Sequence, residues 1–310
     1  MKVLFTGGGG AGAEALWQLY AQRYEVHFAD ADINTIDPIV CPGQRHQIPM
    51  ASDDMFFEEV HELCKKLEID VLVPSVDEEL LILAHGIDKI LPTKLMLPDY
   101  EFVDVMLDKL SMIMKLAKKN IPIPLTFSLD DDFSGISFPC ISKPRKGRGS
   151  RDVVVLNARE EAQALKMTLG PSANDFIVQN KIEGQEYTVQ MAANSNGVLS
   201  AVVPVKVAVK RGITIVAEVE AEPKVIEACK IIHAACPTKG CYNIQLILTE
   251  DGKVMPFEIN PRVSTTYCLV VAADVDPIEI FLEKDNLGEL APFSSGMQLR
   301  RHWQNHFSKG

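Results

Sequence analysis

The sequence lacks the features of a disulfide-bonded or membrane-spanning protein. Its seven cysteines are an odd number and include no Cys-x-x-Cys pair, so we expect reduced thiols in a reducing compartment. No apolar run approaches the roughly 20 residues that cross a bilayer. The apolar run at residues 2–6 reaches glycine too soon to form the core of a signal peptide. We therefore expect a cytoplasmic protein with no membrane partner.

Positive charge is also scarce. The 31 Lys and Arg residues are outnumbered by 42 Asp and Glu residues, for a net charge of −11. Such a surface repels phosphate backbones, which argues against general nucleic-acid binding. A hydrophobic share of 47% is typical of a globular protein, and the length favours about two domains.

Several familiar site patterns are missing. The sequence contains no Walker phosphate loop, no Gly-x-Ser-x-Gly nucleophile motif and no protein-kinase signature. Cys229, His233, Cys236 and Cys241 lie near one another, but their spacing matches no zinc site that we recognise. Buried thiols are the favoured interpretation of these cysteines.

Strands and helices alternate at the start of the chain. Apolar strands are expected at 2–6, 25–29 and 71–73, with helices from about 13 and at 55–68. This order predicts a parallel sheet with right-handed crossovers. We assign residues 1–95 to an amino-terminal α/β domain.

The rest of the chain predicts an α+β domain at 96–290, with a smaller lobe at about 116–182. A carboxy-terminal tail with an edge strand follows at 291–310. Helices are expected at 102–119, 158–169, 223–236 and 265–282. Strands are expected at 138–143, 152–156, 175–180, 187–192, 198–205 and 213–219, with a hairpin at 241–260.

Glycines follow the first strand in the pattern Gly7-x-Gly9-x-x-Gly12, and Asp30 ends the next strand. This spacing is a dinucleotide fingerprint, in which backbone amides approach a phosphate. A nicotinamide-dependent oxidoreductase is therefore one interpretation. A tight strand-to-helix turn that requires glycine is the other.

A dense basic loop at 142–151 stands out in this acidic protein. It reads Ser-Lys-Pro-Arg-Lys-Gly-Arg-Gly-Ser-Arg. Flexible amides together with Lys and Arg suit a lid over a triphosphate. A solvated basic turn fits the same residues.

The hairpin permits a prediction of register. Asp251-Gly252 is a strong signal for a two-residue turn, which places Gln245 opposite Glu258. Side chains alternate along strands, so one face carries Asn243, Gln245, Glu258 and Asn260. These oxygen donors suit a hard cation such as Mg²⁺. The other face would turn Leu246, Leu248, Met255 and Phe257 to a core.

Residues 257–264 read Phe-Glu-Ile-Asn-Pro-Arg-Val-Ser. With Gln245 upstream, they resemble the metal-binding end of the ATP-grasp superfamily, and most closely a single ATP-binding unit of the carbamoyl-phosphate synthase large subunit. Further landmarks at 108–124, 138–144 and 179–187 follow in the order of that family. The resemblance covers about 1–285 and implies an ATP-grasp fold, in which ATP lies between two α+β lobes.

The resemblance also implies roles for individual residues. Lys109 and Lys143 would bind the phosphates of ATP, and 145–151 would close as a lid that includes Arg145, Gly147, Gly149 and Ser150. Gln179, Lys181 and Ile182 would contact adenine, and Glu186 the ribose. Mg²⁺, with Mn²⁺ as a substitute, would be held by Gln245, Glu258 and Asn260. Lys143 and Arg262 would be the catalytic residues. Gln179 departs from the family, where glutamate is frequent.

The function implied is that of a carboxylate–amine ligase acting through an acyl phosphate, with release of ADP and phosphate. Small-molecule carboxylate and amine substrates are expected, and a homodimer is left open. Asp77 and Glu78 would bind a substrate ammonium or simply begin a helix. Lys206, Lys210 and Arg211 would hold a carboxylate or line a solvated strand. A non-catalytic nucleotide-binding partner protein is a further alternative.

Overall fold

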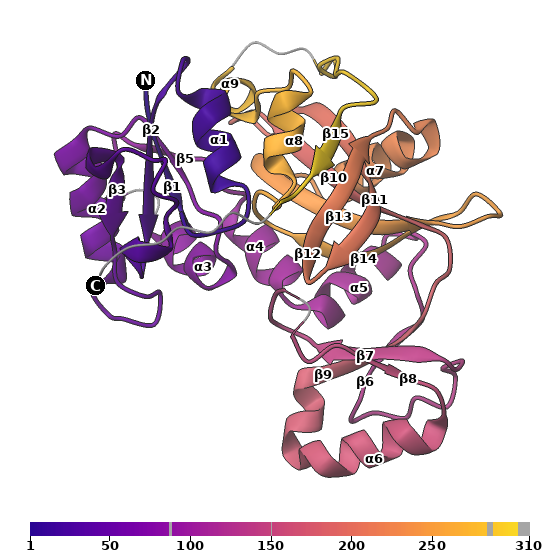
Figure 1. Ribbon diagram of the computed structural model, residues 1–310. Coiled ribbons are helices and arrows are strands. Elements are labelled where there is room, and N and C mark those ends of the chain that lie inside the picture. The colour runs from indigo at the N-terminus through magenta and orange to yellow at the C-terminus, as the bar shows by residue number, and fades with distance from the viewer. Residues whose placement is uncertain (87–88, 150, 284–287, 303–310) are drawn as a thin grey trace.

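The computed structural model describes residues 1–86, 89–149, 151–283 and 288–302, and Figure 1 shows its three sheets. One sheet belongs to the amino-terminal part of the chain, one to the small lobe and one to the large lobe. None of the helices in the described part of the chain is both long and apolar enough to span a membrane.

The amino-terminal sheet has the order β3-β2-β1-β4-β5, and all its neighbouring strands are parallel. The strands are β1 (Lys2–Thr6), β2 (Glu25–Asp30), β3 (Arg45–Gln47), β4 (Val71–Val73) and β5 (Lys94–Leu95). Helices α1 (Ala13–Tyr20), α2 (Phe56–Leu67) and α3 (Asp77–His85) connect or follow them. β1 and β4 are continuous apolar runs because both faces of a parallel sheet are buried. The predicted parallel sheet is confirmed.

The small lobe is a four-stranded antiparallel sheet of order β6-β9-β7-β8. Its elements are β6 (Thr126–Ser128), β7 (Cys140–Pro144), β8 (Val154–Leu156), α6 (Arg159–Leu169) and β9 (Phe176–Asn180). Figure 1 shows that this lobe projects away from the rest of the molecule.

The large lobe is built on an antiparallel sheet of order β14-β13-β10-β11-β12-β15. The strands are β10 (Gln185–Ala193), β11 (Leu199–Arg211), β12 (Ile213–Val219), β13 (Gly240–Leu248), β14 (Val254–Asn260) and β15 (Gln298–Arg300). One face packs on α4 (Tyr100–Leu107), α5 (Lys109–Ala117) and α7 (Pro223–Ala235). The other packs on α8 (Tyr267–Ala272), α9 (Pro277–Leu282) and the amino-terminal domain.

Two helices predicted as continuous are interrupted. Asp108 separates α4 from α5, because its backbone is extended and its carboxylate accepts hydrogen bonds from the amides of Leu110 and Ser111. Asp276 caps α9 in the same way through the amide of Ile278. An aspartate that caps a new helix ends the preceding one. The first interruption makes Lys109 the first residue of α5.

The turn of the β13–β14 hairpin differs from the prediction. The amide of Thr249 donates to the carbonyl of Lys253 at 2.9 Å, so three residues form the loop, and Gly252 has φ 82°. A bulge then shifts the register between Gln245 and Leu246. The two offsets cancel, so Gln245 does lie opposite Glu258, as predicted.

The same bulge corrects the predicted faces of the hairpin. Leu246 pairs with Pro256, and Ile247 pairs with Met255. Phe257 lines a cavity, whereas the prediction placed it on the core face. Leu246 and Val254 supply the buried side of the hairpin.

Candidate active site

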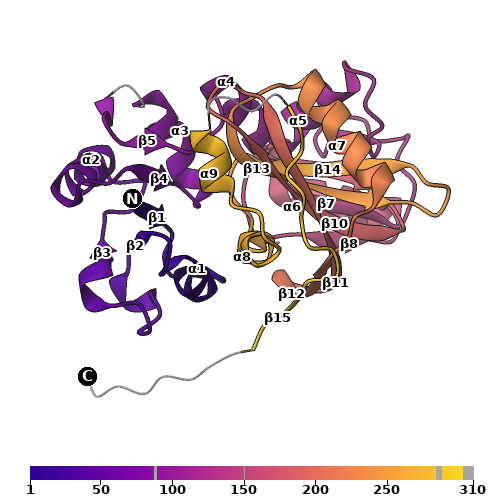
Figure 2. The same cartoon turned by 90° about the horizontal axis from the view of Figure 1, so that it is seen from above.

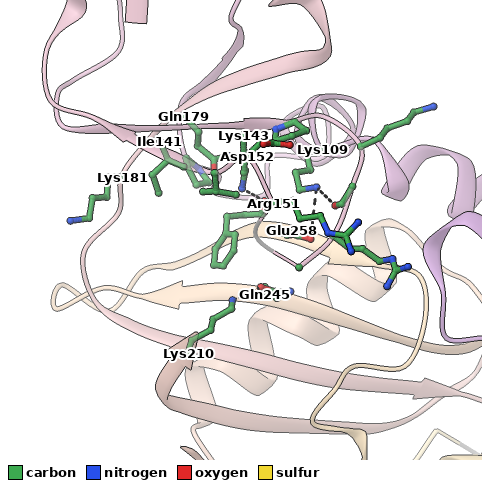
Figure 3. A pocket seen from close by; sticks show the side chains of 18 of the residues that line it. Lys109, Ile141, Lys143, Arg151, Asp152, Gln179, Lys181, Lys210, Gln245 and Glu258 are labelled. Carbon is green, nitrogen blue, oxygen red and sulfur yellow. Dashed lines mark hydrogen bonds and ion pairs between the residues drawn. The ribbon is translucent and has the colours of Figure 1, made fainter. Parts of the chain in front are cut away.

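A cavity of about 520 Å³ separates the small lobe from the sheet of the large lobe. The small lobe contributes β7 and the segment at 179–182, and the basic loop lies along one side. β11, β13 and β14 contribute the opposite wall (Figure 3).

Among the lysines that line this cavity, three come from three different helices and strands. Lys143 extends from β7, and its Nζ donates to the carbonyl of Phe257 at 3.4 Å. Lys109 begins α5, and its Nζ donates to the carbonyl of Gly147 at 2.9 Å. Lys210 extends from β11. A concentration of positive charge in an enclosed cavity attracts a polyanion.

Lys143 is the most enclosed of the three, with 6% of its surface exposed. Burial lowers the pKa of Lys143 to about 8, and the nearby charges of Lys109 and Lys210 act in the same direction. Glu258 opposes this shift. A bound anion would favour the charged ammonium and raise its pKa again.

Of the predicted metal set, Gln245 and Glu258 line this cavity, whereas buried Asn260 does not. Gln245 and Glu258 are paired across the two strands, and a Glu258 oxygen lies 3.9 Å from Lys109 Nζ. The amide nitrogen of Asn260 donates to Oδ1 of Asn243 at 3.2 Å, which orients its side chain. One carboxylate and two amide oxygens are hard donors that fit Mg²⁺. In the part of the chain that the structure describes, this cavity included, no cluster of three His, Cys, Asp or Glu side chains could hold a metal.

The end of the cavity near 179–182 is less charged. Gln179 is 2% exposed and donates to Thr126 Oγ1 at 2.8 Å. Ile182 and Phe257 also line this cavity. The Lys181 side chain points away from the other labelled residues in Figure 3, so only its backbone faces a ligand. An apolar slot beside an exposed backbone edge suits a planar base.

Glu186 is held by an ion pair that the sequence did not indicate. Its Oε1 lies 2.5 Å from Lys210 Nζ, which also donates to Gln245 Oε1 at 2.9 Å. Lys210 is therefore part of the site, where the sequence left it between two interpretations.

Other predicted site residues lie elsewhere or have different partners. Arg145 does not line the cavity, because its guanidinium binds the Asp108 carboxylate at 2.8 and 3.1 Å. Lys206 pairs with Glu220 at 3.0 Å, outside both cavities described here. Arg211 also lines neither of them. Gly147 and Gly149 line the first cavity, and Ser150 lies outside the described residues.

A second cavity, of about 980 Å³, lies at the carboxyl ends of β1 and β4. It is lined by the glycine turn, Asp30, Glu79 and Arg262, among others. Its wall is shared with the first cavity at four residues, Glu78, Arg148, Gly149 and Arg151. Arg148 Nε pairs with a Glu78 oxygen at 3.1 Å. Asp77, also predicted to bind substrate, is hydrogen bonded to Arg262.

The glycine turn is internally bonded. The amide of Gly9 donates to Asp30 Oδ2 at 2.9 Å, and the amide of Gly10 donates to the carbonyl of Gly7 at 2.9 Å. These amides are engaged, and the Asp30 carboxylate occupies one of them. This arrangement disfavours a pyrophosphate on the turn, as the oxidoreductase interpretation would require.

Glu79 is a buried acid in the second cavity, and it follows the two acids predicted to bind a substrate ammonium. It is 6% exposed and accepts a hydrogen bond from Thr6. Burial raises the pKa of Glu79 to about 7, with the hydrogen bond from Thr6 acting in the opposite direction. The cavity therefore contains a carboxyl group that can gain or lose a proton near neutrality.

Comparison with known proteins identifies similar sequences and folds. The model of a family described as ATP-grasp domain matches residues 106–266. The formate-dependent phosphoribosylglycinamide formyltransferase of Ignicoccus hospitalis is 22% identical over 302 residues, covering 88% of this chain and 72% of that protein.

Solved structures share the fold at low sequence identity. Carboxyaminoimidazole ribonucleotide synthase from Aspergillus clavatus, complexed with ATP, has a TM-score of 0.71 at 14% identity, covering 94% of this chain and 79% of that one. N5-carboxyaminoimidazole ribonucleotide synthetase from Thermotoga maritima has a TM-score of 0.63 at 21% identity, covering 90% and 73%. L-amino acid ligase from Bacillus licheniformis has a TM-score of 0.68 at 14% identity, covering 90% and 72%.

Proposed function

Because this chain belongs to the ATP-grasp family, we propose that it is an ATP-dependent ligase that joins a small carboxylate to an amine. The observation that supports this most is that Lys109, Lys143 and Lys210 converge on a cavity between two lobes. Glu258, the only carboxylate of the predicted metal set, lines the same cavity. That arrangement suits a triphosphate. The narrower likeness to carbamoyl-phosphate synthase units stays a prediction.

Nucleotide binding would use the groups already oriented in the first cavity. Lys109 and Lys143 bind phosphate oxygens through charge-assisted hydrogen bonds. The backbone at 181–182 contacts the adenine edge, and Glu186 accepts from the ribose hydroxyls. Bound Mg²⁺ would be held by Glu258 together with Asn260, since Lys210 already donates to the Gln245 oxygen, and it would neutralise phosphate charge.

The carboxylate and the amine would bind in the second cavity. A carboxylate oxygen attacks the γ-phosphorus and ADP leaves, which forms an acyl phosphate. An amine nitrogen then attacks the acyl carbon, inorganic phosphate leaves, and the amine loses a proton. Arg262 and Arg148, which line this cavity, would bind the anionic reactants. Such chemistry depends on positioning and charge stabilisation and needs no side-chain nucleophile.

The names of the relatives indicate a substrate class. One relative is formate-dependent and another is an L-amino acid ligase. We therefore propose a small organic acid or bicarbonate as the carboxylate, and an amine of similar size. The shared wall of the two cavities supports this proposal, because reactants bound in them would lie near the basic loop.

A nucleotide panel tests the proposal. Thermal unfolding is measured with ATP–Mg²⁺, ADP and NADH, followed by a screen of acid and amine pairs for ADP release. A ligand at 100 times its Kd stabilises the folded state by about 2.7 kcal/mol. We expect stabilisation by ATP–Mg²⁺ and ADP release with one acid–amine pair. Stabilisation by NADH alone would contradict the proposal.

The variant Glu258→Gln tests the assignment of the metal set. It removes the only carboxylate of the set while keeping its shape, so turnover should fall by at least about 100-fold. Unfolding free energy should change little. Glu250→Gln, at the exposed tip of the same hairpin, is the matched control and should retain full turnover. Unchanged turnover in Glu258→Gln would remove this residue from the site.

A further inference from the structure

A cation of the protein itself lies among the residues assigned to metal binding. Lys210 Nζ is 2.9 Å from Gln245 Oε1 and 2.5 Å from Glu186 Oε1. The same atom is 6.0 Å from the centre of the Phe257 ring. Figure 3 shows the Lys210 side chain directed at Gln245. The amide oxygen that would bind a metal therefore already accepts a hydrogen bond from an ammonium group.

The backbone of β11 directs Lys210 into the cavity. Its pairing with β12 shifts register between Val207 and Val209, and again between Val209 and Lys210. Irregularities of this kind redirect side chains. Lys206, which precedes both shifts, pairs with Glu220 outside the cavity. The different placement of these two lysines is thus built into one strand.

The metal set is poor in negative charge. Glu258 is its only carboxylate, and it already lies 3.9 Å from Lys109. Mg²⁺ is usually held by one or two carboxylates together with substrate phosphates. A second divalent ion on Gln245 would have to share one neutral oxygen with the Lys210 ammonium, and like charges repel at such short range.

We propose that Lys210 is a resident cation that takes the place of a second metal ion. It occupies the Gln245 oxygen, supplies positive charge beside the phosphates, and limits the protein to one divalent ion, held by Glu258, for each bound ATP. Many phosphoryl-transfer sites use two metal ions. This inference rests on the proposed function, because it requires ATP in the first cavity.

Counting bound Mn²⁺ tests the proposal without measuring turnover. The full chain is saturated with AMP-PNP, a non-hydrolysable ATP analogue, and titrated with Mn²⁺. The electron paramagnetic resonance signal reports the free ion. We expect one bound Mn²⁺ per chain in the wild type. We expect two in Lys210→Met, which frees the oxygens of Gln245 and Glu186. Lys206→Met is the matched control and should bind one.

The outcomes separate this inference from the proposed function. Equilibrium dialysis of labelled AMP-PNP first establishes that nucleotide binds. Two Mn²⁺ ions per wild-type chain, or an unchanged count in folded Lys210→Met, would overturn the resident-cation proposal and leave the ligase proposal intact. No bound nucleotide would overturn both. The number of Mn²⁺ ions bound per wild-type chain tests the resident-cation proposal even if Lys210→Met does not fold.

Discussion

The amino-terminal domain and the small lobe are joined to the large lobe in different ways. The amino-terminal domain shares one hydrophobic core with the large lobe, in which Val3 and Phe5 pack in the same cluster as Val203, Val270 and Phe281. Figure 2 shows α1 beside α8 at this joint. The small lobe has a separate core whose residues all lie between 127 and 178.

Polar contacts at the two joints differ as well. At the first, the buried carboxylate of Asp276 accepts from Tyr20 at 3.1 Å and Tyr24 at 2.6 Å. At the second, Lys143 contacts the carbonyl of Phe257, and Arg145 of the small lobe pairs with Asp108 at 2.8 Å. The first set of contacts is structural, whereas the second includes a lysine that we propose binds ATP. One joint is therefore fixed by a shared hydrophobic core, whereas the other depends on polar contacts between two separate cores.

The largest effect is expected from breaking the fixed joint with Asp276→Ala. This change leaves two tyrosine hydroxyls without their buried acceptor and removes one of the two carboxylate partners of Arg23, whose Nη1 lies 3.2 Å from Asp276. Loss of one partner from a buried charged network costs about 3–5 kcal/mol. Urea denaturation should show this loss. Glu279→Gln, which alters only the exposed contact of Arg23, is the control, and an equal loss there would contradict the explanation.

A smaller effect is expected from Glu79 in the amino-terminal domain. The pKa of Glu79 is raised to about 7 in the folded protein, above 4.5 for the free side chain. The folded state therefore holds a proton that the unfolded state releases, so this stabilisation is present below pH 4.5 and is lost as pH rises through about 7. Its size is about 3 kcal/mol.

Glu79→Gln should remove that pH dependence. Urea denaturation at pH 4.5, 6 and 8 should give a flatter profile of unfolding free energy than the wild type. Glu78→Gln, one residue earlier and exposed, should keep the wild-type slope in this range. Parallel profiles for wild type and Glu79→Gln would show that the acid is not protonated in the folded protein.

Next in size is the loss of ATP affinity in Lys143→Ala, which removes a charged side chain from the joint between the small and large lobes. We expect a cost of about 1.5–3 kcal/mol in binding by calorimetry at pH 7. In the wild type, affinity should also decline as pH rises above about 8, because the Lys143 ammonium then loses its proton. Lys181→Ala, whose side chain points away from the cavity, should bind ATP normally. Wild-type affinity in Lys143→Ala would place this lysine outside the phosphate site.

The smallest effect concerns exchange rates at the two joints. ATP–Mg²⁺ should slow amide hydrogen exchange severalfold at 144–149, because these residues close over the nucleotide. Exchange in α1 and α8 should not change, since their packing does not involve the cavity. Mass spectrometry of peptic peptides measures both regions together. Equal protection of the basic loop with and without nucleotide would argue against a closing lid.

Much of the fold could be predicted because the relevant signals are local. The apolar runs at β1 and β4 and the alternation with helices predict the parallel sheet. The break at Asp108 was missed because the apolar pattern continues across it, whereas Pro277, the first residue of α9, marks the break at Asp276 in the sequence. The capping hydrogen bonds of Asp108 depend on a backbone conformation that the apolar pattern does not encode.

Site residues on one hairpin could be predicted, because the turn fixes which residues face each other. Contacts between elements distant in the sequence could not be predicted in this way. Gln245 and Glu258 face each other as expected. A bulge turns Phe257 to the cavity, and the prediction placed it on the core face because a bulge leaves no clear mark in the sequence. The direction of Lys210 depends on bulges in β11. Glu79 looks like an ordinary acid in the first turn of a helix, and only the fold buries it against Thr6.

The bulge in the β13–β14 hairpin also determines where this protein tolerates added sequence. β13 is paired with β10 along its whole length, and Asn260 is hydrogen bonded to Asn243 on the far side of the bulge from the turn. The position of Glu258 opposite Gln245 is therefore fixed by the pairing of β13 with β10 and by the Asn243–Asn260 hydrogen bond, and not by the turn. Residues inserted at the exposed tip, between Thr249 and Lys253, would leave Glu258 in place. That tip is a suitable attachment point for an affinity tag or a fluorescent label that reports on the working enzyme.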